Sequence, residues 1–212
     1  MPWYVRICFG VVADDMFLSF TQAVSGIAAD ARQLVKRAAE ECSGYKQNFS
    51  EAIPPKALAE RLAGYLHAYT CYWYLRPFGA SILVAGYNVE TNQHELWMAE
   101  PSGDVAQYRG AAAGKGTRSA KTEIEKGRFM DKTCREALPE IARVLHTVHD
   151  TSRDKPFALE MYWLCKESSW LAAAVPGELL SEAEEAGGAA AASKPAGAAS
   201  AVEQDEDGDI AI

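Results

Sequence analysis

One run of the sequence has residues and spacing that suggest nucleotide chemistry, namely Gly110-Ala-Ala-Ala-Gly114-Lys115-Gly116-Thr117. It lies between a predicted strand and a predicted helix, as a phosphate-binding loop does. Such a loop needs four residues between its glycines and a serine or threonine directly after the lysine, whose hydroxyl reaches the metal. Here three residues separate Gly110 from Gly114, and Gly116 follows Lys115. A tight turn is therefore favoured over nucleotide binding.

The histidines offer a second kind of site. His146 and His149 lie three positions apart on a predicted helix, beside Asp150, which would place two metal ligands on one face. A third ligand at a suitable spacing is not visible, so a solvated helix end, where imidazole complements the helix dipole, is favoured. His67 lies among tyrosines that we expect to pack between layers. We expect no metal and no cofactor.

Five cysteines are scattered along the chain without a Cys-x-x-Cys pair: Cys8, Cys42, Cys71, Cys134 and Cys165. Their odd number and their spacing fit a reducing compartment better than a disulfide framework. A nucleophilic Cys–His pair stays open, because distance in the sequence does not determine distance in the fold. A buried structural thiol is the favoured interpretation for all five.

The charge is unevenly divided along the 212 residues. Residues 1–177 contain 20 acidic and 20 basic side chains, whereas residues 178–212 contain 9 acidic side chains and only Lys194, so the net charge of −8 resides near the C-terminus. Basic residues between positions 115 and 128 alternate with Glu123 and Glu125, which favours a solvated helix face or a subunit contact over a nucleic-acid patch. Asp14 and Asp15 interrupt the apolar start, so we expect neither a membrane segment nor a signal peptide.

The apolar periodicity predicts elements that could position these residues. Helices are predicted over residues 28–48, 56–72 and 117–129, and a fourth, capped by Asp131, runs to about His149. Strand-like runs cover residues 80–89, 94–99 and 105–112, which indicate an antiparallel meander, and residues 157–164. A short acidic helix starts at residues 176–177 and ends near Ala186, before a segment too poor in apolar residues to order. Strands grouped apart from helices indicate a layered α+β fold.

A series of short motifs follows in order between residue 25 and about residue 185. They are Ser25-Gly-Ile-Ala-Ala-Asp-Ala-Arg32, His67-Ala-Tyr-Thr70, Arg76-Pro-Phe-Gly79, Glu100-Pro-Ser-Gly103, Ala120-Lys-Thr-Glu-Ile-Glu-Lys126 and Val148-His-Asp150. Taken together they resemble alpha-type subunits of the 20S proteasome, most closely the eukaryotic class called alpha type-3 or alpha-7. The acidic C-terminal residues are also similar to that class.

This resemblance implies a four-layer α-β-β-α sandwich of the Ntn-hydrolase type. It also implies a subunit without catalytic residues. Catalytic relatives of the beta type use an N-terminal threonine, whose hydroxyl attacks and whose amine serves as base. This sequence begins with Met1 and Pro2, and its first threonine is Thr21.

The resemblance further implies the partners. They are other alpha subunits in a seven-membered ring, the ring of beta subunits, and a regulatory ATPase particle or other activators, in the cytoplasm and nucleus. Activator tails enter pockets between alpha subunits, held by a lysine and by a Ser-Gly-Leu turn, which Ser25, Gly26 and Ile27 match. The lysine cannot be assigned in this sequence. A second motif, expected to be structural or to contact another subunit, consists of Arg76, Pro77, Phe78 and Gly79.

Residues 1–24 match none of the motifs that precede this turn in the family, where a gate-forming tail, a helix and two strands are found. One interpretation is an incomplete start, favoured because a sheet without those strands has unpaired edges. The other is that residues 4–12 and 17–24 replace the strands. We thus expect an atypical segment 1–24, an alpha-type domain 25–186 and a disordered acidic tail 187–212. Two alternative functions stay open: an independent Ntn-type hydrolase and a nucleotide-binding enzyme.

Overall fold

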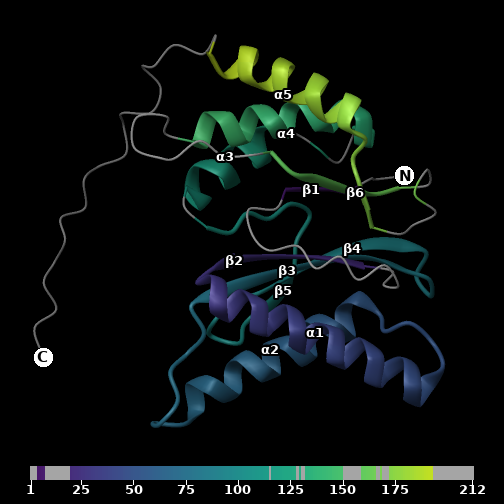
Figure 1. Ribbon diagram of the computed structural model, residues 1–212, viewed down its shortest axis with the longest axis vertical. Coiled ribbons are helices and arrows are strands. Elements are labelled where there is room, and N and C mark those ends of the chain that lie inside the picture. The colour runs from purple at the N-terminus through teal and green to yellow at the C-terminus, as the bar shows by residue number, and fades with distance from the viewer. Residues whose placement is uncertain are drawn as a thin grey trace, which may run out of the picture.

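The computed structural model describes residues 4–7, 20–114, 116–127, 129, 132–149, 159–165, 168 and 172–192. The strands are β1 (Tyr4–Ile7), β2 (Phe20–Gly26), β3 (Ala80–Asn88), β4 (Gln93–Ala99), β5 (Val105–Gln107), β6 (Met161–Leu164) and β7 (Ala173–Ala174). The helices are α1 (Ala28–Phe49), α2 (Pro55–Cys71), α3 (Thr117–Gly127), α4 (Cys134–Val148) and α5 (Gly177–Ala192). Figure 1 shows the strands gathered between two groups of helices, so the predicted α+β class is confirmed.

The strands form two antiparallel sheets, one in the order β2-β3-β4-β5 and the other in the order β1-β6-β7. The predicted meander is confirmed as β3, β4 and β5, but β5 ends at Gln107 and not at Ala112. Tyr108 still donates its backbone N–H to the oxygen of Leu96, at 2.8 Å. Beyond it the chain leaves the sheet edge, because Tyr108 and Ala111 pack against one face of the sheet.

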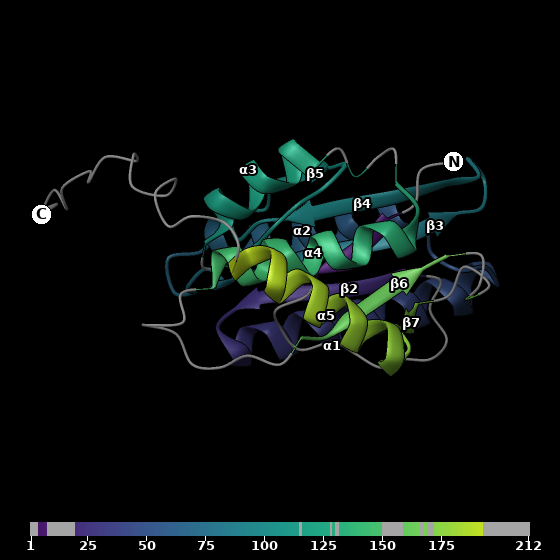
Figure 2. The ribbon, with the colours of Figure 1, turned by 90° about the horizontal axis from the view of Figure 1, so that it is seen from above.

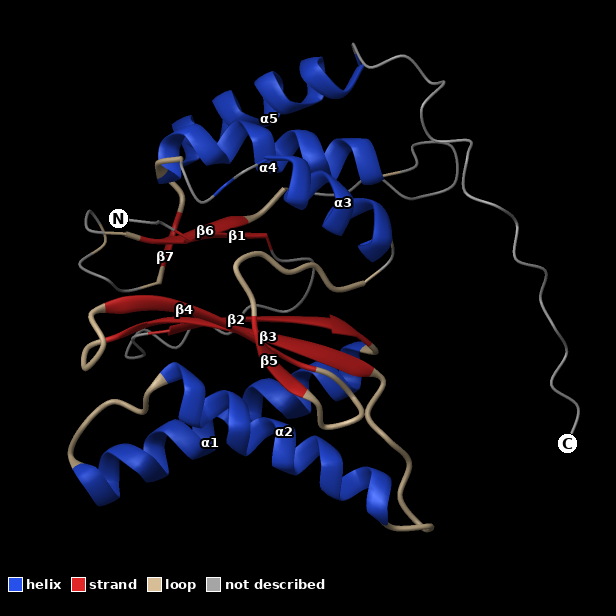
Figure 3. Cartoon of the chain, turned by 180° about the vertical axis from the view of Figure 1, so that it is seen from behind, coloured by secondary structure: helices blue, strands red, loops and turns tan. Residues whose placement is uncertain are grey.

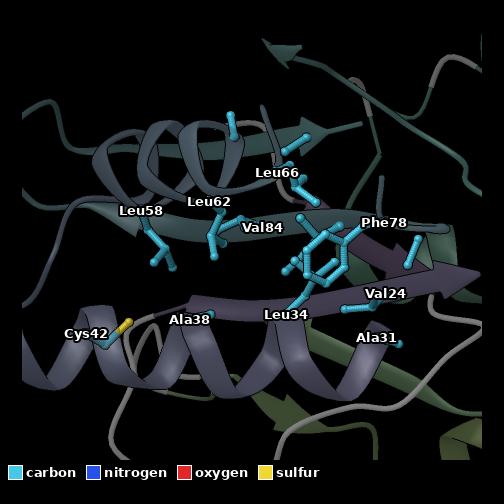
Figure 4. Close-up of a cluster of buried hydrophobic side chains, with 14 of the residues drawn as sticks. Val24, Ala31, Leu34, Ala38, Cys42, Leu58, Leu62, Leu66, Phe78 and Val84 are labelled. Carbon is cyan, nitrogen blue, oxygen red and sulfur yellow. The ribbon is translucent and has the colours of Figure 1, made fainter. Parts of the chain in front are cut away.

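Helices α1 and α2 cover one face of the four-stranded sheet (Figure 3). Both match their predicted ranges to within one residue at each end. Pro55 is the first residue of α2, where the missing N–H of proline leaves no hydrogen bond unmade. Leucine side chains then fill the space between the helices and the strands, and Leu34, Leu62 and Leu66 are fully buried there (Figure 4).

Residues of β3 alternate between the two faces of the sheet, and both faces are covered. Ile82 and Val84 belong to the cluster under α1 and α2. Leu83 and Ala85 belong to a second cluster on the opposite face, together with Met98 of β4. Figure 3 shows the sheet of β1, β6 and β7 on that opposite side. The uninterrupted apolar run of β3 follows from burial on both faces.

Helices α4 and α5 lie side by side on the outer side of the second sheet (Figure 2). The N-cap of α4 is Thr133, whose hydroxyl accepts from the N–H of Glu136 while the Glu136 carboxylate accepts from the N–H of Thr133. The cap is therefore Thr133 and not the predicted Asp131, which itself lies outside the described residues. The Thr-x-x-Glu spacing is the sequence signal for this capping box.

The end of α5 corrects a prediction. The helix continues to Ala192 and not to Ala186, although glycine disfavours helix. A Cβ on Gly187 would lie 2.6 Å from the Cβ of Ala142, so the absence of a side chain lets α5 approach α4 closely. This tertiary contact extends the helix beyond its predicted end. The remaining residues of the predicted tail, 193–212, lie outside the described residues.

The residues before the turn at position 25 include two strands. β2 pairs with β3 along its full length, from Phe20 opposite Gly86 to Gly26 opposite Ala80. β1 pairs with β6, so that Ile7 lies opposite Met161. The second interpretation of the start assigns residues 4–12 and 17–24 to strands. β1 lies within the first segment, and β2 begins in the second and runs on to Gly26.

The last predicted strand is shorter than expected, and one short strand was missed. β6 begins at Met161, which pairs with Ile7 at the end of β1. The sequence pattern placed the start of this strand at residue 157, which lies outside the described residues. β7 is two alanines long and adds to the edge of β6. Within the described part of the chain, no helix combines the length and the apolar character that crossing a membrane requires.

Candidate functional site

The two motifs singled out by sequence meet at one corner of the four-stranded sheet. Residues 25–27 lead from β2 into α1, and residues 76–79 lead from α2 into β3. Because β2 and β3 are paired, these turns lie side by side. The N–H of Ile27 donates to the oxygen of Gly79 at 2.9 Å. The structure therefore brings together Ser25, Gly26 and Ile27 with Arg76, Pro77, Phe78 and Gly79.

Glycine is required at the contact between the two turns. Gly26 has a φ of +139°, and a Cβ there would lie 2.1 Å from the oxygen of Gly79. A Cβ on Gly79 would in turn lie 2.5 Å from Cδ1 of Ile27. Each glycine thus leaves the space that the other turn occupies, and neither turn can move independently.

Asp30, which sequence analysis did not single out as a site residue, links both turns. It lies in the first turn of α1 and is buried, with its carboxylate accepting from Arg76 Nη1 at 2.7 Å and Arg76 Nη2 at 2.8 Å. The N–H of Gly79 donates to the same carboxylate at 2.8 Å. Arg76 also donates to the oxygen of Pro77 at 3.1 Å. The signal available in the sequence was an acidic residue in the first turn of a predicted helix.

These donors set the ionisation of Asp30. The hydrogen bond from Arg76, followed by the one from Gly79, lowers the pKa of this carboxyl from 3.8 to about 2, against the opposing effect of burial. The same pair raises the pKa of Arg76. Asp30 is therefore ionised at neutral pH and occupied by structural donors, so it is suited to hold the turns and not to act as a base.

Phe78 anchors the second turn in the core. Its side chain is buried and its ring centroid lies 4.7 Å from that of Tyr69 and 5.6 Å from that of Tyr65. The hydroxyl oxygens of the two tyrosines are 3.1 Å apart. This hydrogen bond, followed by burial, raises the pKa of Tyr69. Part of the predicted tyrosine packing is thereby confirmed.

A hollow of about 390 Å³ opens beside the ion pair. It is lined by Asp30, Gln33, Tyr69, Tyr74, Leu75, Arg76 and Phe78. Two apolar side chains close in sequence to the lining residues are exposed to solvent. Ile27, just before α1, is 53% exposed, and Trp73, next to Tyr74, is 94% exposed. The corner thus combines a fixed backbone with accessible apolar side chains, which suits the binding of another chain and offers no described nucleophile–base pair.

The glycine-rich run packs against the same corner. Gly114 has a φ of +107°, and a Cβ there would lie 2.5 Å from Oγ of Ser25. Gly116 has a φ of +76°, and its Cβ would lie 2.3 Å from Cγ1 of Val148. Lys115 lies outside the described residues. The glycines allow close approach to the protein itself, which agrees with the predicted tight turn.

The other residues weighed in the sequence are distributed over the molecule. Glu123 is not on a solvated face, since it is buried and accepts from Arg143 at 3.0 Å and from Lys126 at 3.3 Å. His67 is exposed and does not pack between layers. Among the residues that the structure describes, no group of three His, Cys, Asp or Glu side chains could hold a metal ion.

The cysteines differ in exposure. Cys42, Cys134 and Cys165 are buried, as predicted, whereas Cys71 is exposed, which corrects the prediction for that residue. Cys8 lies outside the described residues. Burial of the first three follows from their positions on the inner faces of α1, α4 and the end of β6.

Comparison with known proteins gives a consistent result. A family model described as "Proteasome subunit" matches residues 19–164. The proteasome subunit alpha type-3 of Spinacia oleracea is 49% identical over 168 residues, which are 79% of this chain and 67% of the relative. That of Arabidopsis thaliana is 47% identical over 164 residues, covering 77% and 65% of the two chains. The probable alpha type-7 subunit of Saccharomyces cerevisiae is 40% identical over 165 residues, covering 75% and 56%. The chain thus spans about two thirds of the length of the plant relatives.

Proposed function

Because the chain belongs to the proteasome subunit family, we propose that it serves as a non-catalytic alpha-ring subunit of the 20S core particle. The observation that carries this proposal is the 49% identity to an alpha type-3 subunit over 168 residues. The family match over residues 19–164 includes both turns of the corner described above. In this role the chain scaffolds the outer ring and contributes to the docking of regulators in the cytoplasm and nucleus. The partners are the other subunits of a seven-membered ring and the adjoining beta ring.

We infer that the fold is the four-layer α-β-β-α sandwich of Ntn hydrolases. Its support is the order of the layers, in which α1 and α2 cover one sheet and α4 and α5 lie outside the other. The two sheets meet where β2 contacts β6. Cluster residues such as Leu83 and Met98 occupy the inner face of the larger sheet.

The non-catalytic role is supported by the place of Thr21. A threonine nucleophile of this family needs a free amine on the same residue to act as base. Thr21 lies inside β2, opposite Ala85 of β3, with its backbone nitrogen in a peptide bond. To free that nitrogen, the peptide bond between Phe20 and Thr21 would have to be cleaved within the strand. An independent Ntn-type hydrolase is therefore not favoured, and neither is nucleotide binding through Gly114 and Lys115.

The corner gives this subunit a site at which a regulator tail can dock. The close contact of Gly26 with Gly79 fixes the turn, and the ion pair of Asp30 with Arg76 links α1 to the second turn. The exposed Ile27 side chain is then presented on a backbone that does not need to reorganise. A preformed turn binds with a smaller entropic cost than a mobile one.

The experiment is expression of the full chain with an affinity tag in cells that contain proteasomes. We expect it to co-sediment with a large peptidase assembly, and the isolated chain to cleave no fluorogenic peptide. Recovery of the chain only as a free monomer would contradict the assembly role. Peptide cleavage by the isolated chain would contradict the non-catalytic role.

The docking site is tested within the same assemblies. Ile27→Asp places a charge on the exposed turn, and we expect it to weaken regulator binding while the ring still assembles. Val89→Asp is the matched control, because Val89 is also exposed but lies beyond the far end of β3. Equal regulator binding by both variants would show that the turn is not part of the docking site.

A further inference from the structure

A cysteine and a histidine lie next to each other on the exposed face of α2, outside the corner. Cys71 is the last residue of the helix, and its Sγ lies 3.5 Å from Nε2 of His67, one helical turn earlier. Both side chains are exposed, whereas the other described cysteines are buried. Residues four apart on a helix are neighbours on its surface, so the pairing needs no distortion.

A backbone carbonyl fixes the imidazole of this pair. Nδ1 of His67 lies 3.3 Å from the oxygen of Ser102. Because a carbonyl oxygen only accepts, Nδ1 carries the proton in this contact, and the lone pair of Nε2 faces Sγ of Cys71. The Cys71 thiol can then donate to Nε2. Nucleophile, base and a third group that orients the base are thus present together.

The turn that supplies the carbonyl is itself held against the histidine. Gly103 has a φ of +91°, and a Cβ there would lie 2.5 Å from the Cβ of His67. Its N–H donates to the oxygen of Glu100, and the N–H of Glu100 donates to the oxygen of Asp104, each at 2.9 Å. The carbonyl of Ser102 therefore belongs to a rigid turn packed directly on α2. The tautomer of His67 follows from that packing.

We propose that Cys71 is a modification site, a thiol that His67 deprotonates and that undergoes exchange with low-molecular-mass disulfides. The thiol proton passes to Nε2 of His67, and the thiolate attacks one sulfur of the disulfide. A new S–S bond joins Cys71 to that sulfur as the original S–S bond breaks. The leaving thiolate takes the proton from His67, so Cys71 is oxidised and half of the disulfide is reduced to a thiol.

The surroundings leave this thiol accessible. Tyr72, Trp73 and Tyr74 follow it and are exposed. The turn that packs on His67 contains two carboxylates, Glu100 and Asp104, and Ser102 Oγ donates to the latter at 3.0 Å. Thr70 Oγ1 donates to the backbone oxygen of His67 at 2.7 Å, so in its 3.5 Å contact with Nδ1 of His67 it acts as the acceptor.

The first test maps the modified residue. The full chain carries Cys8→Ser, so that its cysteines are Cys42, Cys71, Cys134 and Cys165. It is treated with oxidised glutathione at pH 7 with a chelator and analysed by peptide mass spectrometry. We expect a mixed disulfide at Cys71 and none in Cys71→Ser. Modification that spares Cys71, or that distributes equally over Cys42, Cys134 and Cys165, would overturn the proposal.

The second test isolates the base. We expect His67→Gln to slow the exchange at Cys71 by roughly tenfold at pH 7, where an unassisted thiol is mostly protonated. His149→Gln, the same substitution at the C-cap of α4, is the matched control and should keep the wild-type rate. The slowing should disappear at high pH, where a thiol ionises without help. An equal rate for His67→Gln and wild type at pH 7 would overturn the role of His67.

A third measurement needs no variant and so does not depend on whether one folds. The rate at Cys71 in the folded chain is compared with its rate in the same chain unfolded in urea, at pH 7. An unassisted exposed thiol reacts at least as fast when unfolded. We expect the folded chain to react about tenfold faster. A folded rate equal to or below the unfolded rate would overturn the proposal.

Discussion

Helices α1 and α2 pack on a sheet in which β2 and β3 pair over seven residues, whereas α4 and α5 pack beside one whose strands pair over four and two residues. The first core is rich in fully buried leucine, such as Leu34 and Leu62. The second mixes alanines with large side chains such as Met161 and Trp163, and its helices α4 and α5 are in close contact. The corner with the docking turn therefore lies on the side that is joined by the longer strand ladder.

The largest expected effect compares the two cores directly. Leu62→Ala removes a fully buried side chain, and we expect a loss of about 2–5 kcal/mol in the free energy of unfolding. Ile141→Ala in α4 should cost less, about 2 kcal/mol, because Ile141 is 4% exposed whereas Leu62 is fully buried. Urea unfolding of the full chain, followed by circular dichroism, measures both. An equal or larger loss for Ile141→Ala would reverse the comparison.

An intermediate effect is expected at the corner. Gly26→Ala forces a Cβ against the oxygen of Gly79 at a positive φ, and we expect a loss of about 1–3 kcal/mol together with weaker regulator binding. Gly44→Ala in α1 is the control, because its Cβ would meet nothing within 4 Å. It should stabilise the chain by about 0.4–1 kcal/mol. A neutral Gly26→Ala would mean that the turn is not locked.

The smallest effect concerns acid stability on each side. The pKa of Asp30 is lowered to about 2, so its carboxylate contributes stability above pH 3.8 that is lost as the pH falls toward 2. On the other side, bonds from Thr133 lower the pKa of Glu136, and its contribution is likewise lost on acidification. We expect Asp30→Asn to flatten the pH dependence of unfolding between pH 4 and pH 2. Glu136→Gln is measured in parallel. If Asp30→Asn leaves the slope of unfolding free energy against pH unchanged, the lowered pKa of Asp30 is contradicted.

Local patterns predicted the elements that depend on local physics. The apolar spacing of α1 and α2 and the turn formers between β3, β4 and β5 located these elements closely. The sequence pattern did not locate β7, because two alanines have neither alternation nor β-propensity. The end of α5 depends on the contact of Gly187 with Ala142, which is tertiary and leaves no trace in local composition.

The candidate site was predictable in its parts and not in its assembly. Both turns were identified from short motifs, yet their contact rests on the register of β2 with β3. The ion pair joins Asp30 to Arg76 across the whole of α1 and α2, so no spacing rule connects them. His67 was placed on the wrong side of α2, because aromatic neighbours suggested packing and its partner Ser102 is far away in the sequence.

The pairing of β2 with β3 has a consequence for how the chain folds. These strands are neighbours in the sheet, but α1 and α2 lie between them in the sequence. Closing so long a segment costs chain entropy before any strand contact forms, which slows folding. A helical hairpin of α1 and α2 shortens the effective distance, since it returns the chain to the end of β2. The order of events we expect is therefore helices first and sheet closure second, with the glycine contact between the two turns completed last.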